Sequence, residues 1–509
     1  MSPAAVTRIH QMVDGHAEAT PQRLAVIDAD GTQVTYAAYR DATRAAADTL
    51  RAAGVRAGDR VLIVAENCFT LAALILACSR LDAWAIPVNA RMTAAEIGRV
   101  AAHATPRVTA FTTAVSPEAR AHAEAAGAQV HETGFGAVAL AGDETARPEP
   151  VRADADQVAV LLYTTGTTGA PKGVMLTHAN LCFAAEASAD LRDLTAQDRV
   201  YGALPLTHVF GLASMLMASA HAGACVQLET RFSPERLLAA LRDGATAFPA
   251  VPQMHALLMK HTADLGMTRL EGAKLRYVSS GAAPLDPAWK RKAEAFYGLA
   301  LQNGYGMTET TAGICGTRNP PGTPDVSVGK PLKGVEVRID APDHEGVGEI
   351  LTRGPHVMTG YYRNPVETAR VLDAAGWLRT GDMGRFDEDG NVHVVGRCKE
   401  LIIRSGFNVY PPEVEAALTE HPGVVQAAVV GRRVEGGNEE VMAFVQGSDA
   451  LLDEEALKRF VGERLASYKC PSRIVLVDRL PAAPSGKILK TRLLDTFADR
   501  LDPAEAPRS

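Results

Sequence analysis

The segment of this chain best suited to hold an anion runs from Thr164 to Gly173 and reads TTGTTGAPKG. It follows the apolar run Val158–Leu162, so a strand should lead into a loop. Glycines let backbone N–H groups turn towards an anion, threonine hydroxyls add donors, and Lys172 adds a mobile positive charge. Proline precedes the lysine and glycine follows it, so this is not the common nucleotide loop G-x-x-x-x-G-K-S/T. A plain surface turn is the alternative interpretation.

A second glycine-rich segment, Gly304–Thr310, carries an acid that suits such a loop. It reads GYGMTET and follows the predicted strand Leu299–Gln302. A carboxylate beside a polyphosphate makes sense mainly as a magnesium ligand, because it would otherwise repel the phosphates. Glu309 is therefore a candidate metal ligand, and Tyr305 could stack on a base. A solvated glutamate in a turn is the alternative.

Weaker signals lie elsewhere in the chain. Asp382, in RTGD at a predicted strand end, can accept both hydroxyls of a ribose, although Gly-Asp is also an ordinary turn. The small residues of Ser279–Pro284 form a predicted strand-to-helix turn, which could be a floor for a planar ring or only a tight connection. By itself, Lys487 is interpreted as a solvated surface charge and His208 as a packed core residue.

The elements that must position these residues alternate over the first two thirds of the chain. Apolar runs predict strands and amphipathic patterns predict helices, at Val61–Val64, Val226–Leu228, Pro234–Leu241, Ala247–Val251, Leu275–Val278 and Pro287–Phe296. This alternation favours α/β layers with largely parallel sheets. From Val337 the pattern changes, and short runs between Gly, Asp and Pro predict antiparallel strands at Glu336–Ile339, Gly348–Thr352 and Val392–Val395.

A third pattern begins after Gly396 and predicts a small α+β domain. Its expected elements are helix Pro412–Thr419, strands Val424–Gly431 and Val441–Gln446, helix Glu454–Leu465 and strand Ile474–Val477. The charged segment Gly396–Glu400 is the best boundary. We therefore predict one domain over residues 1–396 and a second over residues 397–509.

Composition excludes several classes of protein. The 509 residues predict roughly three domains by size. A net charge of −7 without a basic stripe argues against nucleic acid as a partner. The start lacks a signal-peptide pattern, and Arg80 and Asp82 interrupt the most apolar stretch, so no transmembrane segment is expected. Seven scattered cysteines, never paired as C-x-x-C, predict a reducing cytoplasm rather than a zinc site or disulfide framework.

Together these segments resemble the adenylate-forming superfamily of acyl-CoA synthetases, nonribosomal-peptide adenylation domains and luciferase-like enzymes. The resemblance runs from about Ala17 to Leu493 and is strongest to a bacterial fatty- or aromatic-acid–CoA ligase. Its motifs, in the family's order, are YTTGTTGAPKGVMLTH (163–178), LPLTHVFGL (204–212), YGMTET (305–310), GEILTRGPHVMTGYY (348–362), WLRTGD (377–382), GRCKELIIRSGFNVYPPEVE (396–415) and PSGKILK (484–490).

The resemblance implies an α/β fold with a large N-terminal domain and a small, mobile α+β C-terminal domain. The large domain would contain two αβ-layered subdomains and a β-rich subdomain. It would bind ATP and the acyl substrate, with Mg²⁺ as cofactor and coenzyme A as co-substrate. The small domain would carry the catalytic Lys487.

The resemblance also implies a role for each segment. The phosphate-gripping residues would be Thr164, Thr165, Gly166, Thr167, Thr168, Gly169 and Lys172. Adenine would lie between Gly281, Ala282 and Ala283 on one side and Asn303, Gly304, Tyr305 and Gly306 on the other. Asp382 and Arg397 would bind the ribose hydroxyls. Glu309 would hold magnesium, with Thr308 near the α-phosphate. Lys487 would bridge the carboxylate and the α-phosphate and counter the charge of the transition state.

Thioester formation would need a rotation of the small domain about Lys399. That rotation would remove Lys487 and bring the loop 403–409, with Ser405, Gly406 and Phe407, towards coenzyme A. The implied acyl pocket is formed by the catalytic-site residue His208 together with Val209, Phe210, Ala213, Val251, Gly281, Gly304 and Met307.

The pocket residues restrict the class of acid. Val209 stands where amino-acid-adenylating relatives place an aspartate, so a zwitterionic substrate is disfavoured. Apolar and small side chains favour an aliphatic or aromatic monocarboxylate. No carrier region follows Lys487, which favours free CoA as acceptor. An acyl-AMP ligase that loads a carrier protein, a luciferase-type oxygenase and a noncatalytic binding homologue are the alternatives. A homodimer is considered, and the sequence leaves the oligomeric state open.

Overall fold

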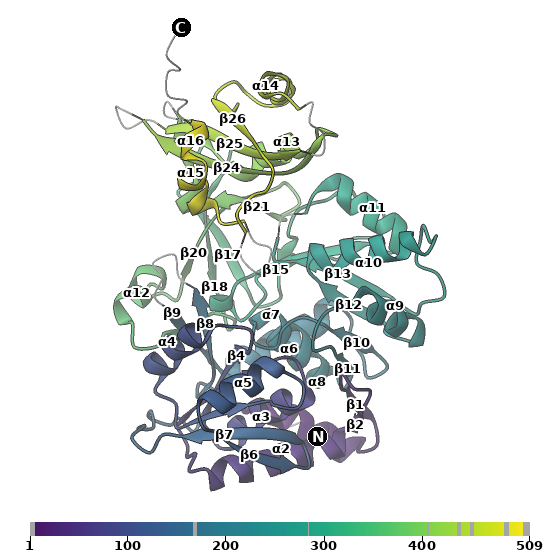
Figure 1. Ribbon diagram of the computed structural model, residues 1–509, viewed down its shortest axis with the longest axis vertical. Helices are drawn as coiled ribbons and strands as arrows, with labels where there is room; N and C mark the ends of the chain where they lie inside the picture. The colour runs from purple at the N-terminus through teal and green to yellow at the C-terminus, as the bar shows by residue number, and fades with distance from the viewer. Residues whose placement is uncertain are drawn as a thin grey trace. The chain divides into compact units, whose positions relative to one another are not determined.

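The computed structural model describes residues 6–165, 171–283, 285–404, 407–434, 439–447, 452–482 and 488–501 (Figure 1). The chain divides into two compact units. The first comprises Met1–Val337, Leu351–Arg379 and Gly390–Val392, and the second Arg338–Ile350, Thr380–Asp389 and His393–Ser509. Compactness does not locate a hinge, so the division after Gly396 stays a prediction.

A nine-stranded sheet forms one half of the first unit. Its order is β16 (Lys330–Pro331), β15 (Cys315–Gly316), β14 (Leu301–Tyr305), β13 (Tyr277–Gly281), β12 (Ala247–Ala250), β10 (Arg199–Gly202), β11 (Cys225–Leu228), β1 (Leu24–Ile27) and β2 (Gln33–Thr35). The strands from β14 to β1 are parallel, and the strands beyond them at both edges pair antiparallel. The predicted parallel sheet is confirmed.

An eight-stranded sheet forms the other half. Its order is β19 (Gly360–Tyr361), β9 (Pro171–Thr177), β8 (Val158–Thr165), β4 (Trp84–Asn89), β3 (Arg60–Ala65), β5 (Val108–Phe111), β7 (Gly136–Gly142) and β6 (Gln129–Thr133). Strands β8, β4, β3 and β5 are parallel, whereas β9 turns back on β8 as a hairpin partner and β19 extends the sheet beyond β9.

Helices cover both faces of each sheet, which gives the first unit five layers. Along β3, Val61 and Ile63 pack into the core between the sheets, whereas Leu62 and Val64 pack against the outer helices, as alternating side chains must. The outer helices are α4 (Ala94–Ala104) and α5 (Pro117–Ala125) on the eight-stranded sheet, and α9 (Pro234–Asp243), α10 (Pro252–Asp264) and α11 (Pro287–Tyr297) on the nine-stranded sheet. Figure 1 shows α9–α11 beside β12 and β13.

The central layer contains the most apolar helix of the chain. It comprises α1 (His10–Ala19), α2 (Tyr36–Ala52), α3 (Phe69–Arg80), α6 (His178–Leu191), α7 (Val209–Gly211), a π-helical turn (Leu212–Met217) and α8 (Ala218–Ala222). Every residue of α3 from Phe69 to Ser79 is buried. A helix that is apolar around its whole circumference belongs in a core of this kind.

No helix among the described residues has the length and apolar character needed to cross a membrane.

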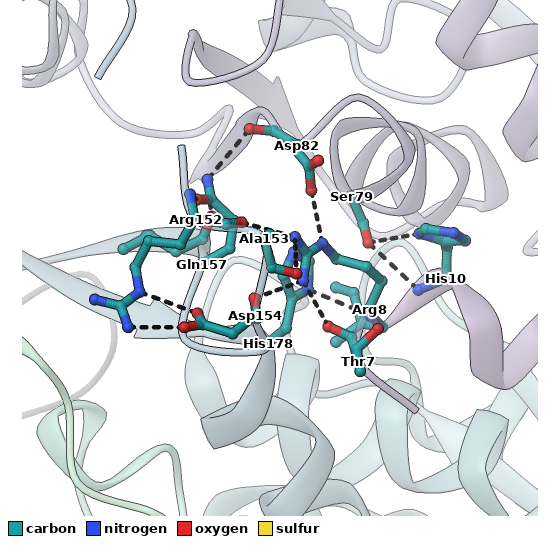
Figure 2. A network of polar contacts seen from close by, with 12 residues as sticks. Thr7, Arg8, His10, Ser79, Asp82, Arg152, Ala153, Asp154, Gln157 and His178 are labelled. Carbon is teal, nitrogen blue, oxygen red and sulfur yellow. Dashed lines mark hydrogen bonds and ion pairs between the residues drawn. The ribbon is translucent and has the colours of Figure 1, made fainter. Parts of the chain in front are cut away.

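A polar network holds residues 7–10 against the segments that precede β8 and follow β9 (Figure 2). The Arg8 guanidinium donates to the Asp82 carboxylate at 2.6 Å and to the backbone carbonyls of Arg152 at 2.9 Å and Asp154 at 2.7 Å. The Ile9 N–H donates to Nδ1 of His178, the first residue of α6. Burial lowers the pKa of His178 to about 3, so its ring is a neutral acceptor. The network therefore holds the chain on either side of the hairpin.

The second unit contains the small α+β fold predicted for the end of the chain. Strands β24 (Val424–Arg433), β25 (Glu439–Gly447) and β26 (Arg473–Val477) form a sheet that is antiparallel between β24 and β25 and parallel between β25 and β26. Along β25, Ala443 and Val445 pack into one core and Met442 and Phe444 into the other, so helices lie on both faces.

The remaining helices and strands belong to both units. The second unit also contains the antiparallel pair β22 (Ile402–Arg404) and β23 (Phe407–Val409) and the helices α13 (Pro411–Thr419), α14 (Glu454–Gly462), α15 (Leu493–Thr496) and α16 (Ala498–Leu501). Helix α12 (Pro365–Val371) belongs to the first unit. A four-stranded sheet is formed by β17 (Glu336–Asp340), β18 (Gly348–Arg353), β20 (Leu378–Phe386) and β21 (Val392–Arg397). The unit bounds fall within the strands of that last sheet and in the connection between β20 and β21.

Three boundary predictions are wrong, for the ends of β13, β14 and α14. Ser279 and Gly304 were expected in turns, but β13 runs to Gly281 and β14 to Tyr305, with Gly281 opposite Gly304. Backbone pairing maintains these strands where small residues give no apolar pattern. Helix α14 ends at Gly462, three residues before the predicted end, because glycine is a poor helix former.

Candidate active site

The β8–β9 hairpin carries the predicted phosphate-binding residues that the structure describes. Thr164 lies opposite Lys172 in the antiparallel register. The Lys172 ammonium forms an ion pair with the Glu367 carboxylate at 2.7 Å, and this contact holds the pKa of Glu367 below its ordinary value. Gly166, Thr167, Thr168 and Gly169 lie outside the described residues, and of Thr165 only the backbone is described. A cation therefore stands at the base of the hairpin loop, on a paired strand.

Glu309 lies in a short 3₁₀ turn, Thr308–Thr310, that follows β14. The residue is only 9% exposed, and its carboxylate accepts a hydrogen bond from the Tyr361 hydroxyl at 2.8 Å. The Tyr361 ring also lies under the Lys172 ammonium, 5.1 Å from ring centre to Nζ. The structure thus brings together the predicted metal ligand and the predicted phosphate-binding cation, through a tyrosine between them.

Gly306, which the resemblance assigns to adenine binding, allows two backbone segments to pass close together. A Cβ at this position would lie 1.3 Å from the carbonyl oxygen of Ala312, so the residue must be glycine to let two backbone segments pass. Just beyond, Thr311 and Ala312 adopt φ angles of 47° and 85°, a left-handed conformation that costs non-glycine residues energy. Strained backbone of this kind persists where the surrounding structure fixes it, as it does beside Glu309.

The two predicted adenine-binding segments lie side by side at the carboxyl ends of β13 and β14. Gly281 pairs with Gly304, and Ala282 follows with a left-handed φ of 66° and an exposed side chain. The Asn303 side chain donates to the carbonyl of Ser327 at 2.9 Å and accepts from the N–H of Gly304. In parallel sheets ligands bind beyond the carboxyl ends of the strands, which suits this placement.

The predicted acyl-pocket residues adjoin this edge. The Phe210 ring lies about where a side chain at Gly281 would reach, 3.2 Å from the Cβ position. Val209, Phe210, Ala213 and Val251 belong to one apolar cluster, whereas Met307 is half-buried beside Thr308.

His208 is not the core residue suggested by its apolar neighbours. It lies at the start of α7 with an exposed side chain, although desolvation lowers the pKa of its imidazole. A small molecule can reach an exposed imidazole at the start of α7, and this position suits a group that meets substrate.

One residue that holds this segment was not among the candidates predicted from the sequence. Asn67, which follows β3, is buried, and its amide donates to the carbonyls of Gly202 and Leu204 at 3.2 and 2.9 Å. It also accepts from the N–H of Leu206 at 2.8 Å. An asparagine two residues after an apolar strand does not by itself indicate such a role, and the contact spans more than 130 residues.

The second unit carries the predicted ribose-binding pair. The Arg397 guanidinium and the Asp382 carboxylate form an ion pair at 3.3 Å, between the end of β21 and β20. Lys399 follows in an exposed 3₁₀ turn, Cys398–Glu400. Phe407 begins β23, whereas Ser405, Gly406 and Lys487 lie outside the described residues.

Replacing Gly306 by alanine should displace the turn that carries Glu309, because the new Cβ would clash with the Ala312 carbonyl. We expect the affinity for ATP with Mg²⁺, measured by calorimetry, to fall by about tenfold or more. The matched control is Gly98→Ala on α4, where the Cβ enters open space. That variant should keep its ATP affinity and gain about 0.5–1 kcal/mol in unfolding free energy. Unchanged ATP affinity in Gly306→Ala would contradict this account of the turn.

Comparison with known proteins agrees with the geometry. Feruloyl-CoA synthase from Amycolatopsis sp is 35% identical over 480 residues, which cover 92% of this chain and 94% of that protein. ATP-bound MatB from Rhodopseudomonas palustris has a TM-score of 0.84 at 30% identity, covering 98% of this chain and 100% of that chain. O-succinylbenzoate coenzyme A synthetase (MenE) from Bacillus subtilis, in complex with ATP and magnesium ion, has a TM-score of 0.79 at 30% identity, covering 95% and 98%.

Family models match both parts of the chain. The model of the AMP-binding enzyme family matches residues 13–362, and that of the AMP-binding enzyme C-terminal domain matches residues 413–487. The first match alone covers more than half of the 509 residues. By these matches, and with the charged groups gathered beside the strand ends of the first unit, the chain belongs to the AMP-binding enzyme family.

Proposed function

We propose that the protein is an AMP-forming carboxylate–CoA ligase. In the first step a carboxylate oxygen attacks the α-phosphorus of ATP, the bond to the bridging oxygen of the β-phosphate breaks, and pyrophosphate leaves. In the second step the CoA sulfur attacks the acyl carbonyl, the bond to AMP breaks, and the thiol proton passes to solvent. The acyl-CoA thioester and AMP are the products.

The observation that carries this proposal is the grouping of Lys172, Tyr361 and Glu309 in the first unit, near the edge where Gly281 meets Gly304. The first step brings two anions together, so catalysis there is positioning and neutralisation of charge. The Lys172 ammonium, on a paired strand, would neutralise charge on the phosphates. The buried Glu309 carboxylate near it would bind a metal ion.

Mg²⁺ fits the donor set at Glu309. The described residues contain no group of three or more acidic, histidine or cysteine side chains that could hold a metal alone. Magnesium commonly binds one or two protein carboxylates together with substrate phosphates, so a single buried carboxylate suits it. Glu309 would hold the ion, which would supply positive charge to the phosphate oxygens.

The remaining roles are proposed from the motifs. Thr308 would contact the α-phosphate, Asp382 and Arg397 would take the ribose hydroxyls, and Lys487 would neutralise the charge that develops between carboxylate and phosphate. The Asp382–Arg397 ion pair supports the ribose assignment, because the pair presents an acceptor and a donor from adjacent strands.

The acid is proposed to be an aromatic monocarboxylate, with an aliphatic acid as the alternative. The half-buried Phe210 ring lies against the bare backbone of Gly281, so an aromatic side chain adjoins the strand end. Val209 offers no charge to an amino group. Two relatives, feruloyl-CoA synthase and O-succinylbenzoate coenzyme A synthetase, are named for aromatic acids.

We also infer a location in the cytoplasm, which the seven free cysteines support. The homodimer stays a prediction.

The products formed with ATP, Mg²⁺, CoA and a mixed pool of aromatic and aliphatic acids test the proposal, with detection by mass spectrometry. We expect acyl-CoA and AMP, with aromatic acids preferred. Acyl-AMP without thioester would indicate a carrier protein as acceptor. No turnover of any acid would contradict the enzymatic function and favour a noncatalytic binding protein.

Replacing Lys399 by proline should separate the two steps. Proline fixes φ near −65° and restricts the residue before it, so a rotation about this position would be blocked. Acyl-AMP formation should stay close to the wild-type rate while thioester formation is lost. The matched control is Lys399→Ala, which removes the charge but leaves the backbone free and should retain both steps. Equal loss of both steps in Lys399→Pro would contradict the hinge.

A further inference from the structure

Tyr361 stands between the two charged groups that the proposed function needs. Its hydroxyl donates to Oε1 of Glu309 at 2.8 Å, and its ring lies under the Lys172 ammonium. The residue is only 7% exposed. These three residues come from three separate stretches of the chain, and Tyr361 is the one that contacts both of the others.

The backbone around Tyr361 is held at several points. Tyr361 pairs with Val174 on β9, two residues from Lys172, and its N–H donates to the Thr368 hydroxyl at 2.9 Å. The segment just before it supports the turn of Glu309. There the Met358 N–H donates to the Glu309 carbonyl at 2.9 Å, and the Thr311 hydroxyl donates to the His356 carbonyl at 2.8 Å.

Asn180, near the start of α6, fixes the same segment from the other side. Its amide donates to the carbonyls of Pro355 and Val357 at 2.7 and 3.0 Å. Residues 355–361 therefore form a strap tied to β9, to α6 and to the Glu309 turn. A side chain on such a strap occupies a fixed place relative to both charged groups, which is what orientation of a ligand requires.

The chemistry of the phenol suits this place. A hydroxyl that donates to Oε1 restrains rotation of the carboxylate and leaves Oε2 for a cation. A tyrosine hydroxyl is protonated at neutral pH, because its ordinary pKa is about 10, so the group remains a donor. The face of the ring attracts the Lys172 ammonium and would continue to do so once phosphates replace Glu367 as its partner.

We propose that Tyr361 is a positioning residue for ATP–Mg²⁺, which orients the Glu309 carboxylate towards the metal and retains the Lys172 ammonium beside the phosphates. This inference rests on the proposed function, because the metal and the phosphates are those of its first step. Replacing a residue that orients a metal ligand commonly lowers metal affinity or activity by about 10- to 100-fold.

The test is Tyr361→Phe, which removes the hydroxyl and keeps the ring. ATP binding is measured by calorimetry without acid, so that nothing turns over, across a range of free Mg²⁺ concentrations. We expect the Mg²⁺ concentration for half of the maximal gain in ATP affinity to rise about tenfold. ATP affinity without Mg²⁺ should change little, because the ring still faces Lys172.

The matched control is Tyr362→Phe. The Tyr362 hydroxyl also donates to a carboxylate, that of Glu149 at 2.5 Å, and the residue is equally buried. This control should lose a comparable amount of thermal stability without a change in the Mg²⁺ dependence. If Tyr361→Phe responds to Mg²⁺ like the wild type or like the control, the hydroxyl is merely structural and the proposal is overturned.

A second variant keeps the proposal testable if Tyr361→Phe does not fold. Glu367→Gln removes the ion-pair partner of Lys172, which leaves the ring as the described contact that holds the ammonium. The proposal predicts an ATP dissociation constant that is unchanged or lower, whereas a higher one would overturn it. If wild-type protein forms no acyl-AMP from any acid, the proposed function itself fails, and the binding comparison distinguishes that outcome from a failure confined to Tyr361.

Discussion

A carboxylate substrate and a triphosphate repel each other. The first unit offsets this repulsion with charged side chains that it holds in fixed places. Lys172 lies on a strand paired on both sides, by β8 and by β19. Glu309 lies in a turn held from below by the strap 355–361. Tyr361 connects the two, so the spacing between cation and carboxylate depends on sheet pairing rather than on flexible side chains.

The layers of the fold explain why this edge is rigid. The two sheets share the core that surrounds α3, and the polar network of Arg8 holds the chain before and after the hairpin. The strained residues of the first unit's ligand edge, Ala282, Thr311 and Ala312, lie next to Gly281 and Glu309. A large core can hold residues in such conformations, and the strain falls where the proposed chemistry needs close approach.

Much of this organisation can be predicted from the sequence. Apolar runs and periodicity predicted α9, α11 and some strands of both units, such as β3, β12 and β25, because these elements pack apolar side chains into a core. The ordered motifs predicted Lys172 and Glu309 as neighbours. Glycine was harder to interpret. Gly306 is required by the backbone of Ala312, whereas Gly281 is the last residue of β13 and Gly304 lies within β14, although both were expected in turns. A glycine in a sequence indicates that a side chain would be unfavourable at that position. It does not indicate whether a ligand or another segment of the backbone occupies the space.

Contacts across long separations could not be predicted. Tyr361 meets Glu309 across 52 residues, and Asn67 meets Leu206 across 139. No spacing rule links such positions, because the sheet order brings them together. By itself His208 was interpreted as a core residue for a related reason, since apolar neighbours in the sequence do not indicate whether a ring faces a core or solvent.

The central claim is that these charges serve attack of a carboxylate on the α-phosphorus of ATP. Exchange of labelled pyrophosphate into ATP, measured with CoA omitted, isolates that step. The account predicts exchange that requires both an acid and Mg²⁺ and that is lost in Glu309→Gln. Exchange that proceeds without acid, or that continues undiminished in Glu309→Gln, would contradict it.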